Sequence, residues 1–305
     1  MSRNATKDLT TGSPMKLILG FGIPLLFGML FQQFYNMMDT IIVGKFLGVS
    51  ALASVGATGS INFMIIGFCM GVCNGFAIPV AQRFGAKDEH GMRKFVANSV
   101  WLSIIFAVVM AVLVCVFCRQ ILELMNTPED IIDGSYSYIF VIFLGIPATY
   151  MYNLLSGIMR SLGDSKTPLY LLIFSSILNI ILDLLSIIVL KMGVAGAAWA
   201  TVIAQAVSGF CCLGVIWKKF PILHVQREEW QPDKLCILNL CNMGIPMGLQ
   251  YSITAIGSVI IQAAVNSLGS VAVASVAAAV KINMFLCCPY DAMGSTMATY
   301  AGQNV

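Results

Sequence analysis

The sequence is poor in charge and in histidine. Of its 305 residues only 10% are charged and two are histidine, whereas 58% are hydrophobic, and the mean hydropathy is +0.87. Soluble domains carry about 25% charged residues. This composition excludes a soluble enzyme, a disulfide scaffold, a disordered tail and a nucleic-acid binder, and it predicts an all-α polytopic membrane protein. The net charge of +3 is too small to indicate a polyanionic partner.

Motifs that bind nucleotides or perform catalysis are also missing. The sequence contains no P-loop, no HExxH zinc motif and no nucleophile elbow, which argues against an enzyme and against ATP as an energy source or partner. The ten cysteines lie in or beside apolar runs, away from both histidines. We interpret them as small packing residues, so neither a resident metal nor a cofactor is expected.

Long apolar runs dominate what is present. A helix needs roughly 20 apolar residues to cross a bilayer. Eight stretches meet this requirement, and the second and eighth are long enough to be tilted or bent: 17–43, 52–82, 95–117, 132–158, 167–190, 195–217, 237–265 and 271–300.

The basic residues predict the orientation. Of the 17 Lys and Arg residues, 13 fall on the side of the N-terminus, three on the other side, and Lys281 lies inside the eighth span. Cytoplasmic loops carry the excess of basic residues. We therefore expect a multi-pass protein of the cell membrane whose N-terminus is cytoplasmic.

An internal repeat relates the two ends of the chain. Gly22-Ile23-Pro24 recurs as Gly244-Ile245-Pro246, and the stretch 47–55 resembles 268–276 at nearly the same offset. Both copies would enter the membrane from the same side, as in parallel repeats. We predict an N-terminal six-helix lobe (1–220), a cytoplasmic linker (221–236) and the first two helices of a second lobe (237–305). The second repeat would then be incomplete, and this chain alone would not transport; the alternative is an asymmetric eight-helix protein.

Polar residues inside the spans mark candidate functional positions, because ionisable groups are costly there. Gln32, Tyr35, Asn36 and Asp39 share one helical face. Asn179 and Asp183 are one turn apart in the fifth span, as are Thr201 and Gln205 in the sixth.

Packed around one cavity, these oxygens could hold a hard cation. We predict a cation site, Na⁺ if a metal, made by Asp39, Asn179, Asp183 and Thr201. The two carboxylates could instead share a proton. The structural alternative is that these polar residues only join neighbouring helices through hydrogen bonds. Substrate or coupling roles are open for Gln32, Tyr35, Asn36, Gln205 and Asp291.

Pro24 and Pro246 occupy equivalent places in the two repeats. Proline frees a backbone carbonyl and allows a helix to bend. We predict hinges at these positions; the alternatives are a fixed kink and a bend that responds to Asp39.

Four stretches together resemble the multidrug and toxic compound extrusion (MATE) transporters: 33–44, 81–86, 160–168, and 179–183 with 196–201. The resemblance implies a MATE-like two-lobe fold with parallel six-helix repeats. It also implies cation-driven export of small organic compounds and a cation site in the first lobe at Asp39, Asn179, Asp183 and Thr201, beside Tyr35. Some family members carry an acidic ligand in the seventh span, but 250–255 contains no carboxylate here.

The function expected is therefore a Na⁺- or H⁺-coupled antiporter for multidrug efflux, monomeric, surrounded by lipid and working by alternating access. The alternatives are a lipid-linked precursor flippase of a related fold and a membrane enzyme or receptor. A flippase would require several basic residues in its cavity, whereas the first six spans contain none in mid-membrane.

Overall fold

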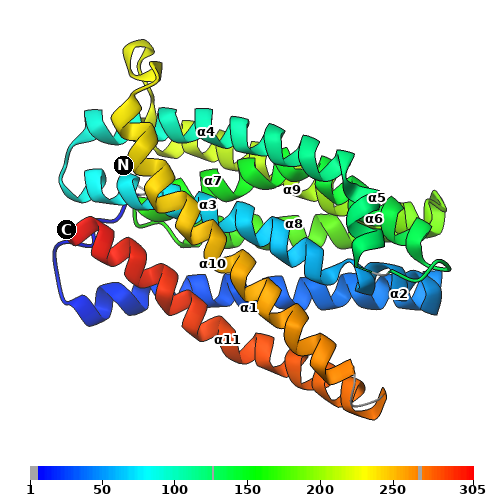
Figure 1. Cartoon of the computed structure of the whole chain (residues 1–305). Coiled ribbons are helices and arrows are strands. Elements are labelled where there is room, and N and C mark those ends of the chain that lie inside the picture. The colour runs from blue at the N-terminus through cyan, green and yellow to red at the C-terminus, as the bar shows by residue number, and fades with distance from the viewer. Residues whose placement is uncertain (1–5, 126, 267–269) are drawn as a thin grey trace.

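The protein is a bundle of long helices (Figure 1). The computed structural model describes residues 6–125, 127–266 and 270–305, with side chains except at 259, 262–266, 270–278 and 280–282. Throughout this part the regular structure is helical and no strand occurs, which confirms the all-α prediction.

The first six predicted spans are confirmed. Five helices in the described part are long and apolar enough to cross a membrane, and a bent pair supplies a sixth span. In chain order these are α1 (Pro14–Leu47), α3 (Gly59–Gly85), α4 (Glu89–Val116), the pair α6 (Ile132–Leu144) and α7 (Ile146–Ser161), α8 (Lys166–Leu184) with a π-helical turn (Leu185–Val189), and α9 (Gly193–Lys219).

Two spans are interrupted where the sequence predicted continuous runs. The second is divided at Thr58 into α2 (Val49–Ala57) and α3. The fourth bends by 46° at Gly145, between α6 and α7. A Cβ atom on Gly145 would lie 2.3 Å from Val202 of α9. The glycine thus allows α9 to approach the bend closely. The short α5 (Cys118–Leu124) lies before α6.

The last two predicted spans form α10 (Lys234–Asn266) and α11 (Ser270–Asn304). Parts of both helices fall outside the described side chains, and neither is among the helices that meet the membrane criterion. The side chains of the second copy of the repeated stretch, 268–276, and of Lys281 are not among those described, so the predictions for them are untested.

The path of the chain agrees with a parallel repeat. In Figure 1, α1 and α10 start from the same end of the bundle, and α3 and α11 return to it. Both marked termini lie at this end. The second pair of helices packs on the first pair, α10 against α3 and α11 against α1.

The N-terminal segment (residues 6–13) lies between the ends of α7 and α11. The Lys7 amide donates to the Leu162 carbonyl at 2.8 Å, and the Leu9 amide donates to Gln303 Oε1 at 2.9 Å. Gln303 Nε2 in turn donates to the Ser161 carbonyl at 2.7 Å. Leu9 and Gln303 are both buried, so this segment connects the first lobe to the last helix.

The turn that receives this segment requires a glycine. Gly163 has φ +83°, and a Cβ atom there would lie about 2.1 Å from the Lys7 carbonyl oxygen. The next residue, Asp164, accepts hydrogen bonds from the Lys166 and Thr167 amides, both at 3.0 Å. Asp164 thus stabilises the start of α8, directly after the turn between the fourth and fifth spans.

The linker before α10 is anchored to α4. Glu229 lies in a short 3₁₀ helix (Arg227–Trp230), and only 1% of it is exposed. Its carboxylate binds Arg93 Nε and His90 Nδ1, each at 2.9 Å, and accepts from the Gln226 amide at 2.8 Å. Burial alone would raise the pKa of Glu229, but these hydrogen bonds outweigh it and lower the pKa below its ordinary value.

Candidate cation site and inter-helix cavity

Two carboxyl groups from different helices meet inside the first lobe. Asp39 lies in α1 and Asp183 in the last turn of α8. Their side chains lie close enough to interact electrostatically, and Asp183 is fully buried. Because two adjacent ionised carboxylates repel each other at low dielectric, the pair requires a shared proton or a bound cation.

Thr201 joins three helices beside this pair. Asn179 Nδ2 of α8 donates to Thr201 Oγ1 at 3.2 Å, and the Tyr35 hydroxyl of α1 lies 3.3 Å from the same oxygen. The sequence-predicted residues Asp39, Asn179, Asp183 and Thr201 are therefore neighbours in α1, α8 and α9, with Tyr35 among them.

Several oxygens of this group lack a partner. Among the residues that the structure describes, the buried oxygens without a hydrogen-bond partner include Asp39 Oδ1, Asn179 Oδ1, both carboxylate oxygens of Asp183, and Gln205 Oε1. All of these atoms are acceptors when the carboxyl groups are ionised. Buried acceptors without a donor are costly, so this donor set fits a hard cation or a proton.

A small cavity of about 20 Å³ opens on the same group. Its lining includes Gln32, Tyr35, Ser176, Thr201 and Gln205. A cavity needs roughly 10–15 Å³ to hold one water molecule. This space therefore suits about one water molecule or ion beside Tyr35, Thr201 and Gln205.

The structure does not bring every predicted residue to this site. Asn36 is exposed on α1, and its carbonyl accepts a hydrogen bond from Thr40. Asp291 is exposed on α11 and lines a different cavity. Pro24 lies inside α1 and Pro246 inside α10, so neither proline ends its helix.

One neighbour was missed from the sequence. Tyr138 of α6 is buried and lies close enough to Asp39, Asp183 and Tyr35 to interact electrostatically with them. A lone tyrosine in an apolar run gives no periodic signal. Only the packing of α6 against α9 places it near the carboxyl groups.

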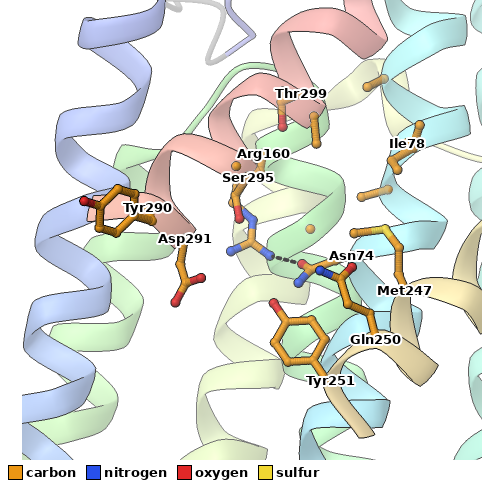
Figure 2. A pocket seen from close by; sticks show the side chains of 15 residues that line it. Asn74, Ile78, Arg160, Met247, Gln250, Tyr251, Tyr290, Asp291, Ser295 and Thr299 are labelled. Atoms are coloured by element: carbon orange, nitrogen blue, oxygen red, sulfur yellow. Dashed lines mark hydrogen bonds between the residues drawn. The ribbon is translucent and has the colours of Figure 1, made fainter. Parts of the chain in front are cut away.

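A second, larger cavity of about 400 Å³ lies among α3, α7, α10 and α11 (Figure 2). Arg160, beyond the predicted fourth span, belongs to the last turn of α7 and lines this cavity. Arg160 Nη2 donates to Asn74 Oδ1 of α3 at 3.0 Å. The predicted fourth span, 132–158, ends two residues before Arg160, whereas the helix continues to Ser161.

The electrostatic character of the two sites differs. The small site contains carboxyl, hydroxyl and amide groups, whereas the large cavity contains one guanidinium group, Arg160, and one carboxylate, Asp291. Within the described residues, no three His, Cys, Asp or Glu side chains form a transition-metal cluster.

Membrane-length helices that surround unpartnered buried carboxyl groups define a multi-pass membrane protein with polar groups buried between its helices. The MatE family profile matches residues 24–185, and this chain belongs to the MatE family of MATE transporters.

Relatives and a solved structure agree with this assignment. The chain is 29% identical to the "Probable multidrug resistance protein YpnP" of Bacillus subtilis (strain 168), over 98% of this chain and 66% of that protein. It is 30% identical to YoeA of the same strain, over 93% of this chain and 63% of that protein. A structure described as the outward-facing conformation of a multidrug resistance MATE family transporter superposes with a TM-score of 0.90 at 25% identity, over 99% of this chain and 67% of that one. The chain thus spans about two thirds of the length of these proteins.

Proposed function

We propose that the protein exports small organic compounds, many of them cationic, across the cell membrane in exchange for Na⁺ or H⁺. The observation that carries this proposal is the pair of neighbouring carboxyl groups, Asp39 and Asp183, with their unpartnered buried oxygens. A site whose carboxyl groups must be neutralised by a cation can load and unload that cation once per transport cycle.

The ligands proposed for Na⁺ are Asp39, Asn179, Asp183 and Thr201. If H⁺ is the coupling ion, the two carboxyl groups share it. Gln32, Tyr35 and Gln205 border the small cavity and are the candidates for a water- or ion-mediated route to the pair. Coupling requires that the cation and the exported compound prefer different conformations, because a ligand shifts an equilibrium only by its differential affinity.

Further features of the proposal follow from the sequence and the family. The N-terminus faces the cytoplasm and Pro24 and Pro246 act as hinges. Neither ATP nor a resident cofactor is needed, no nucleic acid is bound, the protein performs no enzymatic reaction, and it works as a monomer in lipid. The flippase alternative is disfavoured because the large cavity is lined by a single basic residue, Arg160.

The test is gradient-driven drug efflux in proteoliposomes that contain the complete two-lobe protein predicted from the internal repeat, with drug binding measured in parallel. Asp39→Asn keeps the shape of the side chain and removes its charge, so we expect normal folding and drug binding but no uphill efflux. Asp183→Asn should behave in the same way, and the double variant should be no worse than either single one if they act as one site.

Asp130→Asn is the matched control, because Asp130 is an exposed residue of the α5–α6 connection. It should leave efflux unchanged. Uphill efflux at the wild-type rate by Asp39→Asn would show that the coupling carboxylate lies elsewhere.

A further inference from the structure

Two of the ten cysteines flank the break between α4 and α5. Cys115 lies in the last turn of α4, and Cys118 is the first residue of α5. Both are free thiols, and they lie close enough to interact electrostatically. Packing requires small side chains at such positions, but it does not require that two neighbouring ones be thiols.

The backbone at the break holds the two cysteines at the spacing of a disulfide. Phe117 has φ −93° and ψ 8°, close to the values of about −90° and 0° for the third residue of a type I turn. Val116 before it is still helical, as the last residue of α4. Such a turn brings the Cα atoms of its first and fourth residues within about 7 Å of each other, and a disulfide spans Cα atoms about 4.4–6.8 Å apart. Cys115 and Cys118 can therefore be joined without unfolding either helix.

The two residues differ in exposure. Cys115 is half-buried, whereas Cys118 is only 1% exposed. In thiol–disulfide exchange a thiolate attacks a disulfide sulfur and forms a mixed disulfide. Attack on a dissolved disulfide requires access to the surroundings, which Cys115 has and Cys118 lacks. The second, internal attack requires only that the two thiols be neighbours. Cys115 is therefore the residue that meets an oxidant, and Cys118 is the residue that resolves the intermediate.

The position of the pair in the bundle also favours oxidation. In Figure 1, α5 lies at the end of the bundle opposite both marked termini. Arg119 follows the pair directly and forms an exposed ion pair with Glu123 at 3.4 Å. Ionised side chains avoid the apolar interior of a bilayer, so the cysteines lie near the boundary with water. In the proposed orientation this end is external, where disulfides form and persist.

We propose that Cys115 and Cys118 form a reversible disulfide at the external end of the protein, with a low-molecular-weight disulfide as the oxidant. The Cys115 thiolate attacks one sulfur of the oxidant, which releases one thiol and leaves a mixed disulfide on Cys115. The Cys118 thiolate then attacks the Cys115 sulfur and releases the second thiol. The two cysteines lose two electrons and two protons, which the two released thiols carry away. The inference uses the proposed orientation and is independent of the export function.

The first test is chemical and uses the purified protein with oxidised glutathione. After incubation, N-ethylmaleimide blocks the remaining free thiols and trypsin cuts after Lys94 and Arg119. Cys115 and Cys118 are the only cysteines of the resulting peptide, 95–119. Mass spectrometry should find that this peptide has lost both alkylation sites and two hydrogen atoms. Treatment with dithiothreitol before blocking should restore both sites.

A second pair of cysteines provides the control within the same sample. Cys69 and Cys73 also lie one turn apart, inside α3, but they are 1% and 0% exposed. They are the only cysteines of the tryptic peptide 46–83. Because no dissolved oxidant reaches either sulfur, this peptide should remain reduced and should be alkylated only after denaturation.

Two variants test the order of the steps. Cys118→Ser removes the resolving thiol, so the reaction should stop with glutathione attached to Cys115. Cys115→Ser removes the accessible thiol, so Cys118 should remain unmodified. Hydrogen exchange of the α5 amides should become slower when the wild-type protein is oxidised, because the ring fixes the turn at Phe117, and Cys118→Ser should abolish this difference.

The second test is the oxidation state in cells that express the protein in air. Blocking with N-ethylmaleimide before lysis, followed by the same digestion, should show peptide 95–119 mainly as the disulfide and peptide 46–83 reduced. A peptide 95–119 that stays fully alkylated after oxidised glutathione, equal oxidation of both peptides, or a pair that is reduced in cells would each overturn the proposal. Export plays no part in either readout, so failure of ion coupling in the efflux assay with Asp39→Asn would leave these results unchanged.

Discussion

Gly75 of α3 and Gly244 of α10 are in backbone contact: a Cβ atom on Gly75 would lie 2.5 Å from the Cα atom of Gly244. One turn along, a Cβ atom on Gly71 would lie 2.5 Å from the Met247 carbonyl oxygen. Glycines spaced by four residues on facing helices allow such close packing in membranes. The main contact between the six-helix lobe and α10 therefore depends on the absence of side chains.

Gly75→Ala should separate α3 from α10. The added methyl group meets backbone rather than a flexible side chain, so the cost should resemble that of overpacking, about 1–3 kcal/mol. A lower melting temperature in detergent would report it. Gly257→Ala in α10 is the control, because nothing lies within 4 Å of that position; equal melting temperatures for the two variants would contradict the contact.

Thr201→Val should impair the cation site without abolishing transport. The hydroxyl that accepts from Asn179 is lost, which leaves a buried amide unpaired at a cost of about 1–3 kcal/mol. We expect a partial decrease in uphill efflux, measured in proteoliposomes. Thr201→Ser keeps the hydroxyl and should retain most of the activity. A Thr201→Val protein as active as the serine variant would remove Thr201 from the site.

Gln303→Ala should release the N-terminal segment. The Leu9 amide loses its acceptor, Gln303 Oε1, so its hydrogen exchange should become faster. Peptide-resolved exchange followed by mass spectrometry measures this change over residues 6–13. Gln120→Ala, at an exposed position in α5, should leave the exchange unaltered. Unchanged protection in Gln303→Ala would mean that other contacts hold the segment.

Glu229→Gln should weaken the attachment of the linker to α4. It should also make the stability of the protein depend less on pH in the acidic range. Because the pKa of Glu229 is lowered in the folded protein, its stabilising contribution is complete above the ordinary glutamate pKa of about 4.3 and is lost as the pH falls through the lower folded value. At neutral pH the variant should lose about 1–3 kcal/mol. Thermal melts between pH 3 and 7 test both points, with the exposed Glu228→Gln as the control.

The proposed orientation can be tested from outside the cell. A cysteine in place of exposed Glu129 should react with a membrane-impermeant thiol reagent in intact cells, whereas one in place of exposed Lys218 should not. The background should be low because each native cysteine is buried or half-buried. External labelling at position 218 with none at 129 would reverse the topology.

The sequence predicted the fold well where the apolar runs are long enough to mark a membrane span. Apolar runs located the first six spans, and helical periodicity grouped Asp39, Asn179, Asp183 and Thr201 before any packing was known. It could not identify Tyr138 or the cavity role of Arg160. Both depend on which helices touch, and an arginine two residues beyond an apolar run gives the same sequence signal in a loop and in a cavity.

The conformation and contacts of Gly163 predict how mutations at this position combine with changes at the N-terminus. Its positive φ and its contact with the Lys7 carbonyl place two demands on one residue. Asparagine tolerates the left-handed backbone conformation. Its Cβ atom, however, would collide with the Lys7 carbonyl oxygen. Position 163 and the start of the chain should therefore be epistatic: Gly163→Asn is harmful while the N-terminal segment is seated and much milder once that segment is removed.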